Sequence, residues 1–303
     1  MQIYLPIAGQ SVNALVIVLL GFGVGLLSGM FGVGGGFLTT PLLIFYGIPP
    51  TVAVASATTQ ITGASVSGAM VHMRRGGVDL KMAAVMIVGG FFGSLVGAAL
   101  FRMLQASGQV DVVISLLYVL ILGWIGAIML KESLAALGAI GASIPVEKPP
   151  RHNRWVASLP LRWRFYSSGL YISPVAPVAI GFVAGIMTVL LGIGGGFILV
   201  PAMIYLLGMP ARVVIGTSLI MILAVSAGTT MVHSLTTHAV DIVLAALLLA
   251  GGVIGAQYGA MLTTRLKPDY LRLALAVIIL LVALRMFLGL FWRPDEIFSI
   301  EYL

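Results

Sequence analysis

Ten apolar segments with almost no charge run along this chain and leave little of it for a hydrated surface. Apolar residues make up 60% of the 303 residues, whereas charged residues make up only 8%. A soluble domain usually carries about 25% charged residues, because its surface must face water. Segments of about 20 apolar residues match the hydrocarbon thickness of a bilayer. The sequence therefore predicts an all-α integral membrane protein.

The apolar segments fall into two groups of five, which predict two transmembrane repeats over residues 1–130 and 174–303. The first group occupies residues 14–31, 37–46, 52–71, 82–100 and 110–130. The second group occupies residues 177–191, 197–207, 213–232, 242–262 and 271–290. The second segment of each group is too short to cross a bilayer as a helix, so it is expected to be a short or re-entrant helix.

A polar stretch over residues 131–173 separates the two groups. It carries six basic residues, two acidic residues and four prolines, and its aromatic residues interleave with arginines. That mixture is typical of a segment that lies against lipid headgroups. We predict a cytoplasmic linker here and not a separate domain.

The two groups are copies of one unit. When the first half is shifted by 160 residues, many of its residues meet identical ones. The matched residues of the first half are Gly21, Phe22, Gly25, Gly32, Gly34, Gly35, Gly36, Phe37, Pro41 and Ile44. After single-residue insertions, His72 meets His233 and Asp79 meets Asp241. Chance does not keep this register over roughly 80 residues, so the sequence indicates an internal duplication.

Loop charge predicts the orientation of the repeats, because basic residues gather in cytoplasmic loops. The loop with Arg74, Arg75 and Lys81 is then cytoplasmic, as is the linker. The corresponding loop of the second repeat, with His233 and Asp241, has no Lys or Arg and falls outside with both termini. No Lys or Arg precedes Arg74, so no cleaved signal peptide is expected. Repeats of inverted topology are typical of secondary transporters. We therefore expect this chain to be a transporter in a bacterial-type inner membrane.

Three consecutive glycines interrupt each repeat just before its short segment. They lie in Phe-Gly-Val-Gly-Gly-Gly-Phe at residues 31–37 and in Leu-Gly-Ile-Gly-Gly-Gly-Phe at residues 191–197. Unwound backbone at membrane depth is tolerated only where it is buried or lines an aqueous cavity. Free N–H groups and the helix dipole at such a break favour an anion. The predicted substrate site comprises Gly34, Gly35, Gly36, Gly194, Gly195 and Gly196.

Two questions stay open at these glycines. Each run is either part of a ligand site or a tight turn at a close helix crossing that touches no ligand. Each break either joins two full spans or forms a re-entrant hairpin. The predicted inversion of the repeats holds in both cases.

Neutral polar side chains near the start of each third segment are further candidates for anion binding. They are Ser56, Thr58, Thr59, Gln60, Thr217 and Ser218. Gln60 is the best of them, because an unsatisfied amide is costly in lipid. The hydroxyls would alternatively bond the preceding helical turn. Arg285 lies within a span, where it would neutralise an anion, pair with a helix end or reach toward the surface.

His72 and His233 each end a third segment and are candidate proton relays, with protons as the coupling ion. The alternative is that each caps a helix C-terminus at the interface. Asp79 and Asp241, at loop edges, are expected to be solvated helix caps. The chain has no Cys and four dispersed His, so we expect no metal and no cofactor. Nothing indicates a catalytic constellation or a nucleic-acid partner.

The duplicated Gly-x-Gly-Gly-Gly-Phe motif, followed by Pro41 or Pro201, resembles the TauE/SafE sulfite-exporter family, also called the 4-toluene sulfonate uptake permeases. The resemblance covers residues 14–130 and 174–291. It implies an inner-membrane permease for small sulfur-containing anions such as sulfite or organosulfonates.

These observations together predict a secondary transporter in which two inverted repeats give alternating access to one site. The expected partners are a small anionic substrate, the lipid bilayer and protons, and a homo-oligomer is left open. The alternatives are a passive anion channel and a non-transporting membrane assembly factor. The direction of transport is not encoded in these features.

Overall fold

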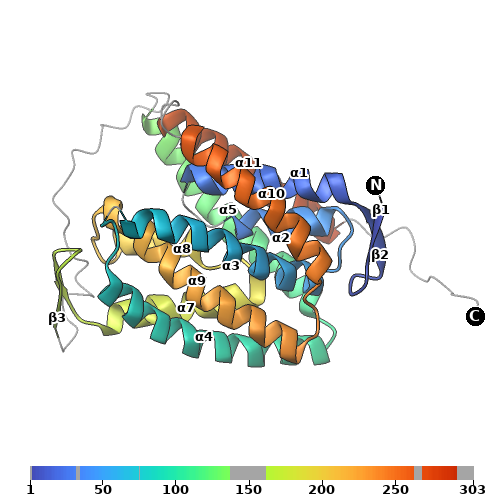
Figure 1. Cartoon of the computed structure of the whole chain (residues 1–303), viewed down its shortest axis with the longest axis horizontal. Helices are drawn as coiled ribbons and strands as arrows, with labels where there is room; N and C mark the ends of the chain where they lie inside the picture. Colours follow the sequence, from blue (N-terminus) through green and yellow to red (C-terminus); the bar gives the residue numbers. More distant parts are fainter. Residues whose placement is uncertain (1, 32–34, 75, 137–161, 263–267, 292–303) are drawn as a thin grey trace, which may run out of the picture.

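The computed structural model describes residues 2–31, 35–74, 76–136, 162–262 and 268–291, which form a helical bundle with two short β-hairpins (Figure 1). The helices of the first repeat are α1 (Ala14–Phe31), α2 (Gly36–Phe45), α3 (Pro50–Arg74), α4 (Leu80–Ala106) and α5 (Val110–Ala136). Those of the second repeat are α7 (Val175–Leu191), α8 (Gly196–Tyr205), α9 (Ala211–Thr236), α10 (Ile242–Leu262) and α11 (Pro268–Phe291). The antiparallel hairpins are β1 (Gln2–Leu5) with β2 (Gln10–Asn13) and β3 (Trp163–Phe165) with β4 (Leu170–Ile172).

The predicted helical membrane fold is confirmed, and the hairpins are an addition to it. Within the described ranges, five helices are long and apolar enough to cross a membrane: α4, α5, α9, α10 and α11. Each predicted apolar segment coincides with a helix. The stretch 131–173, predicted to be a linker, contains the last turn of α5 and the whole β3–β4 hairpin.

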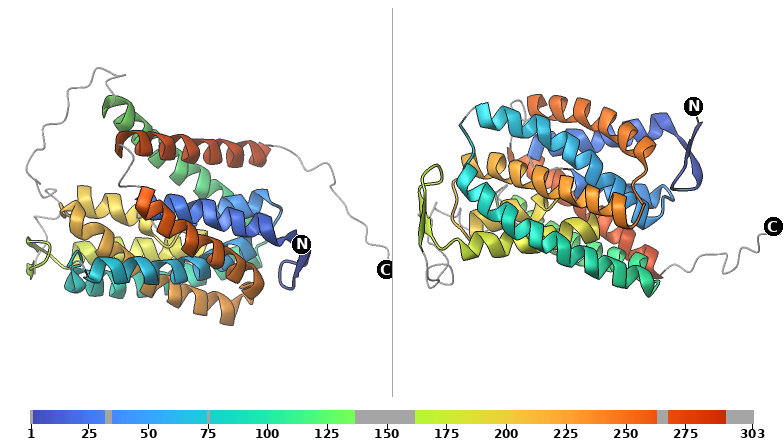
Figure 2. Two further views of the ribbon diagram at one scale, coloured as in Figure 1. Left: turned by 45° about the horizontal axis from the view of Figure 1, so that its top comes forward. Right: turned by 60° about the horizontal axis from the view of Figure 1, so that its bottom comes forward.

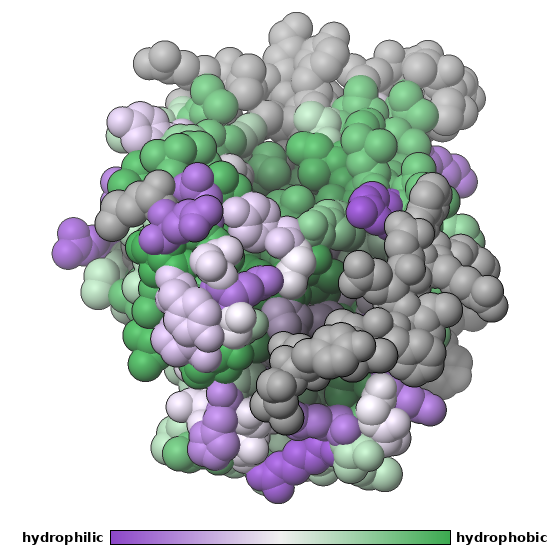
Figure 3. Space-filling view, turned by 90° about the vertical axis from the view of Figure 1, so that its right-hand side faces the viewer, coloured by the Kyte–Doolittle hydropathy of each residue, from purple (hydrophilic) through white to green (hydrophobic). Residues whose placement is uncertain are grey.

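The flanks of the bundle are apolar. Large apolar side chains are exposed there on several helices, among them Leu19, Phe91, Phe92, Trp124 and Leu281. Figure 3 looks onto the end that carries β1–β2 and shows hydrophilic residues on this end, with apolar residues around them. An exposed apolar surface of this extent is typical of a protein that lipid surrounds.

Helices of the two repeats pair reciprocally. α1 packs along α10 and α4 packs along α7, so the first helix of each repeat lies against the fourth helix of the other. α3 packs against α9 and α5 against α11, which pairs each of these helices with its own sequence counterpart. The two hairpins lie at opposite ends of the bundle (Figures 1 and 2). The largest helix interfaces are therefore those between the repeats.

Glycine allows the paired backbones to touch. A Cβ atom at Gly25 in α1 would overlap the carbonyl oxygen of Gly252 in α10. The corresponding pair behaves in the same way, because a Cβ atom at Gly185 in α7 would overlap the carbonyl oxygen of Gly90 in α4. Small residues of this kind permit close helix packing in lipid, where association depends on van der Waals contact.

The carboxylate of Asp79 ties the β3–β4 hairpin to the first repeat. Asp79 is 1% exposed, and its Oδ1 accepts a hydrogen bond from the N–H of Met82 at the start of α4, at 3.0 Å. Its Oδ2 accepts from the N–H and the hydroxyl of Ser168, in the β3–β4 turn, at 3.1 and 2.6 Å. The N–H of Asp79 donates to Thr217 Oγ1 on α9 at 2.9 Å.

Asp241 makes the corresponding contacts at the other end of the bundle. Its Oδ1 accepts from the N–H groups of Val243 and Leu244, both at 3.1 Å, and its Oδ2 accepts from the N–H of Ile7 in the β1–β2 turn at 3.0 Å. Its own N–H donates to Ser56 Oγ on α3 at 3.3 Å. The predicted helix caps are thus present, but they are buried and not solvated, because the hairpin that precedes the first helix of the opposite repeat covers each one.

The start of α1 lies beside the end of α2, so the two helices run antiparallel; whether they form a re-entrant hairpin in the membrane stays a prediction. The N–H of Asn13, just before α1, donates to the hydroxyl of Tyr46, just after α2, at 3.3 Å. In the second repeat α7 packs against α8. α2 and α8 have 10 residues each, so each reaches about half-way through a bilayer core roughly 30 Å thick.

Candidate functional site

The second glycine run is unwound backbone between two helices. Gly192, Gly194 and Gly195 have φ angles of 67°, 70° and 74°, which are left-handed conformations that favour glycine. In the first repeat Gly35 has a φ angle of 66° and immediately precedes α2. The predicted interruption is present at these glycines, whereas Gly34 lies outside the described residues.

The two breaks meet in the interior of the bundle. The ring of Phe37 stacks on the ring of Phe197, with centroids 4.6 Å apart and planes 9° from parallel. A Cβ atom at Gly36 would lie 2.6 Å from the carbonyl oxygen of Gly192. Because the stacked rings belong to the second residues of α2 and α8, the N-termini of the two half-helices converge. Both helix dipoles direct their positive ends here, which favours a negative charge.

Gln60 on α3 is joined to the first break through Thr39. The Thr39 hydroxyl, in the first turn of α2, donates to Gln60 Oε1 at 2.9 Å, and the N–H of Thr39 contacts the carbonyl of Gly35 at 3.4 Å. Gln60 is 4% exposed as a residue, and no described residue accepts a hydrogen bond from its amide nitrogen, which is not itself completely enclosed. A buried amide donor costs free energy unless a ligand or a water accepts from it. The Gln60 amide is therefore a donor that the fold leaves available.

The second repeat has apolar residues where the first has this polar pair. The counterparts of Thr39 and Gln60 are Leu199 and Met221, and both are fully buried. Gln60 and Met221 each lie against a glycine in the fourth helix of the opposite repeat. The two positions are therefore equivalent in space but not in chemistry, and the polar groups belong to the first repeat.

Carbonyl groups at the end of α7 are satisfied by side chains from α5 and α9. The Tyr118 hydroxyl donates to the carbonyl of Leu191. His233 is 1% exposed, and its Nε2 lies 3.1 Å from the carbonyl oxygen of Val189. These contacts serve the orphan carbonyls at the C-terminus of α7, so His233 caps a helix end in the interior and not at the interface; its proton-relay role stays a prediction. Tyr118 has no signal in the sequence, because it lies within an uninterrupted apolar segment.

Replacing Tyr118 with phenylalanine is expected to lower the free energy of unfolding by about 1–3 kcal/mol, because the carbonyl of Leu191 would lose its donor in the interior. The matched control is Y258F, since Tyr258 on α10 is 60% exposed and surface changes usually stay within about 0.5 kcal/mol. Thermal unfolding of the purified variants in detergent measures both. Equal unfolding midpoints for Y118F and Y258F would contradict the hydrogen bond between the Tyr118 hydroxyl and the carbonyl of Leu191.

Most of the predicted hydroxyl ligands donate to their own helices. Thr58 and Thr59 both donate to the carbonyl of Ala55, at 2.7 and 3.2 Å. Ser218 donates to the carbonyl of Ile215 at 2.9 Å. These bonds to the preceding turn are the alternative stated for Ser and Thr in membrane helices, so a role for these three as anion ligands stays a prediction.

The remaining candidates lie at other contacts. Ser56 and Thr217 accept the backbone N–H groups of the two buried aspartates described above, and Thr217 also donates to its preceding turn. The guanidinium carbon of Arg285 lies 5.3 Å from the ring centroid of Phe45, the last residue of α2. A cation is favoured at this negative end of a helix dipole. His72 lies against the first turns of α9.

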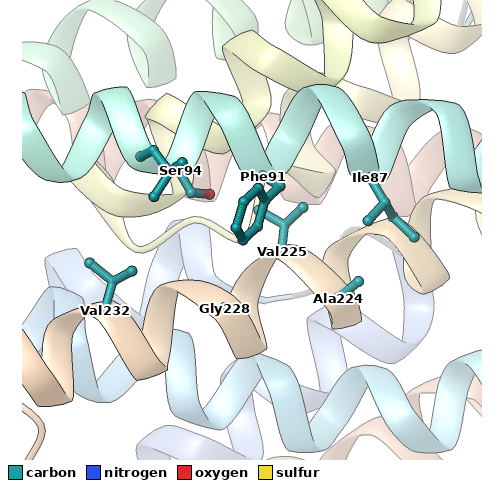
Figure 4. Close-up of a pocket in the computed structure, with 8 residues that line it drawn as sticks. Ile87, Phe91, Ser94, Ala224, Val225, Gly228 and Val232 are labelled. Atoms are coloured by element: carbon teal, nitrogen blue, oxygen red, sulfur yellow. The ribbon is translucent and has the colours of Figure 1, made fainter.

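A pocket of about 50 Å³ lies between α4 and α9. Figure 4 shows Phe91 and Ser94 of α4 facing Val225 and Val232 of α9 across it. Among the residues that line this pocket, Ser94 alone has a polar side chain, and its hydroxyl has no hydrogen-bond partner in the described ranges. A single hydroxyl in an apolar lining does not match the donor set that an anion needs.

Comparison with known proteins gives a family for the whole bundle. The family described as Sulfite exporter TauE/SafE matches residues 17–286, which include both glycine breaks and Gln60. The chain is 30% identical over 275 residues to the probable membrane transporter protein YjnA of Bacillus subtilis (strain 168), covering 89% of this chain and 98% of the relative. No solved structure matches the chain significantly.

Two further relatives carry the same description. The probable membrane transporter protein YunE of Bacillus subtilis (strain 168) is 25% identical over 279 residues, covering 88% of this chain and 94% of the relative. A probable membrane transporter protein of Xylella fastidiosa (strain Temecula1 / ATCC 700964) is 27% identical over 253 residues, covering 83% and 84%. The family match covers most of the chain, and the apolar helices are those of a multi-pass membrane protein. The chain therefore belongs to the sulfite exporter TauE/SafE family of membrane transporters.

Proposed function

We propose that the protein is a secondary transporter that carries small sulfur-containing anions, such as sulfite or organosulfonates, across a bacterial-type inner membrane. The observation that carries this proposal is the convergence of two half-helix N-termini at the stacked Phe37 and Phe197. Backbone amide groups and helix dipoles at such a point bind an anion without a buried cation. The sulfur chemistry of the substrate is supported by the description of the family.

Gln60 is the side chain that we assign to the substrate. Sulfite and sulfonate oxygens are hydrogen-bond acceptors, and the amide nitrogen of Gln60 has no acceptor among the described residues. Thr39 fixes the orientation of this amide, because its hydroxyl bonds the other end of the group at 2.9 Å. A hydrogen bond to a charged group contributes about 1.5–3 kcal/mol, enough to matter for affinity.

The mechanism we propose is alternating access between two repeats of inverted topology, with the linker on the cytoplasmic side and both termini outside. The reciprocal pairing of α1 with α10 and of α4 with α7 supports this proposal. The corresponding contacts of Asp79 and Asp241, made at opposite ends of the bundle, support it further. When two repeats share one fold but differ in sequence, each can adopt the conformation of the other, which opens a shared central site to the opposite side of the membrane.

The test is transport by purified protein in proteoliposomes loaded with radiolabelled sulfite or isethionate. We expect saturable flux that is stimulated by unlabelled substrate on the opposite side. Flux that neither saturates nor exchanges would indicate the passive channel instead. The absence of flux for every sulfur anion tested, with folded protein, would favour a non-transporting assembly factor.

Replacing Gln60 with leucine is expected to reduce the apparent affinity for the transported anion by roughly 10- to 100-fold, the equivalent of one hydrogen bond to a charged group. The matched control is Q257L, because Gln257 lies exposed on α10 and faces no part of the site. Substrate-dependent flux measures both variants, and thermal unfolding verifies that Q60L is folded. Equal affinities of Q60L and Q257L for the transported anion would show that Gln60 does not bind the substrate.

A further inference from the structure

The half-helix α8 is less well covered than its counterpart α2. In the first repeat α11 packs against α2, and Leu38 and Pro41 of α2 are buried. Their counterparts on α8, Ile198 and Pro201, are partly exposed. The helix that corresponds to α11 in the repeat is α5, and it pairs along α11 (Figure 2). One apolar face of α8 is therefore more open than the equivalent face of α2.

A cavity of about 650 Å³ lies along this face, between α8 and α5. The side chains that line it are apolar except for the carboxylate of Glu132 and the hydroxyl of Tyr205. Trp124 and Leu206 belong to the lining and are 70% and 42% exposed, so the cavity opens on the apolar flank of the bundle. An apolar space of this kind holds no ordered water, and a carboxylate repels an anion. The occupant is therefore apolar over most of its length.

The polar end of the cavity lies at the level of the lipid headgroups. Residues 112–130 of α5 carry no charged side chain. At 1.5 Å per residue they span about 28 Å, close to the roughly 30 Å of a bilayer core. Glu132 follows this run, whereas Trp124, at the other end of the lining on α5, lies about 12 Å deeper. The cavity thus begins among the headgroups and extends in the direction of an acyl chain.

The carboxylate of Glu132 suits an ammonium group. The Tyr205 hydroxyl donates to it at 3.2 Å and fixes its position at the mouth of the cavity. Within the described ranges, Glu132 has no Lys, Arg or His as an ion-pair partner. A primary ammonium carries three N–H donors, so it can bond the carboxylate and neutralise it. A lipid with such a headgroup matches both the charge at the mouth and the apolar lining below it.

We propose that the cavity binds a phospholipid whose headgroup carries a primary ammonium, such as phosphatidylethanolamine. Its ammonium lies on Glu132, and one acyl chain covers Ile198 and Pro201 in the way that α11 covers their counterparts on α2. The chain reaches toward Phe197, whose ring stacks on Phe37 where the half-helices meet. The lipid therefore supports the second half-helix in place of a protein helix. This site is separate from the anion site and does not depend on the proposed transport function.

Photo-crosslinking of the purified full-length protein in detergent micelles tests this site. The probe is phosphatidylethanolamine with a photoactivatable group in one acyl chain, and mass spectrometry maps the crosslinked peptides. We expect the crosslinks to concentrate on residues 124–132 and 197–206. Unlabelled phosphatidylethanolamine should compete about three- to fivefold better than phosphatidylcholine with the same chains, because a quaternary ammonium has no N–H to donate. This factor is that of one partly exposed charge pair.

Two pairs of variants separate the headgroup from the acyl chain. Glu132→Gln should abolish the preference for phosphatidylethanolamine, whereas Asp111→Asn, at the other end of α5 and outside the cavity, should keep it. Ala202→Trp fills the cavity and should remove the crosslinks on α8. Ala227→Trp, at an exposed position of α9, should keep them. Thermal unfolding verifies that each variant is folded, and E132Q decides the question if A202W is not, since Glu132 is exposed.

Three results would overturn the proposal. Crosslinks spread evenly over the exposed flanks, for example around Phe91 and Leu281, would mean that lipid surrounds the bundle without a defined site. Equal competition by phosphatidylethanolamine and phosphatidylcholine in the wild-type protein would exclude the ammonium contact. An unchanged preference in E132Q would do the same. None of these measurements requires transport, so the lipid site and the proposed function can fail independently.

Discussion

Replacing Gly25 with alanine is expected to lower the free energy of unfolding by about 3 kcal/mol or more, the upper part of the usual range for overpacking. The added Cβ atom would lie 2.7 Å from the Cα atom of Gly252 and would overlap its carbonyl oxygen. These are backbone atoms, which cannot rotate away, so α1 and α10 would have to separate along their whole interface. The same result is expected for Gly185→Ala, where the overlapped atom is the carbonyl oxygen of Gly90.

Gly23 is the matched control for this experiment. It lies in the same helix, and a Cβ atom added there would meet no other atom within 4 Å. Gly23→Ala should therefore be neutral or stabilising by up to about 1 kcal/mol, because alanine favours a helix over glycine. The unfolding temperatures of the variants are compared by heating each protein and measuring the remaining folded fraction by fluorescence-detected size-exclusion chromatography. A G25A protein as stable as G23A would mean that the close contact between the repeats does not exist.

Replacing Asp79 with alanine is expected to destabilise the protein by about 2–4 kcal/mol, because three buried donors lose their acceptor. These donors are the N–H of Met82 and the N–H and hydroxyl of Ser168. Asp241→Ala should have a similar effect, since the N–H groups of Val243, Leu244 and Ile7 lose theirs. Asparagine at either position keeps an acceptor oxygen, so its cost should be smaller.

Asp111, in the first turn of α5, supplies the control for the aspartate variants because it is exposed. D111A should change the free energy of unfolding by less than about 0.5 kcal/mol, as is usual for surface substitutions. Limited proteolysis adds a second measurement: loss of Asp79 should expose the β3–β4 hairpin, and loss of Asp241 should expose β1–β2. If D79A and D111A unfold at the same temperature, the buried carboxylate does not hold the hairpin.

The positions of the helices are largely predictable from the sequence, because apolar segment length and glycine are local signals. The predicted bounds of α1 and α10 coincide with the observed ones. The hairpins are not predictable in this way: strands of three or four residues give too short a pattern to distinguish from a loop. Their stability depends on Asp79 and Asp241, whose turn partners are 89 and 234 residues away.

The candidate site is predictable in outline only. The glycine runs and Gln60 stand out because three consecutive glycines and an amide are unusual in apolar segments, and the structure joins Gln60 to the first run through Thr39. Thr39 itself gives no distinct signal, since a threonine in a short apolar helix often bonds only its own backbone. The stacking of Phe37 on Phe197 depends on how the repeats dock, which no local pattern contains.

The reciprocal docking of the repeats has a consequence for biosynthesis. Ile7 and Asp241 are separated by 234 residues, so at about 5–20 residues per second the ribosome needs roughly 10–50 s to supply the second partner after the first. During that interval Gly21, Gly25 and Gly29 of α1 lack the helix that packs against them, α10. The amino-terminal half is therefore completed by the last helices to emerge, and translation arrested between the halves should yield a fragment that quality-control proteases remove.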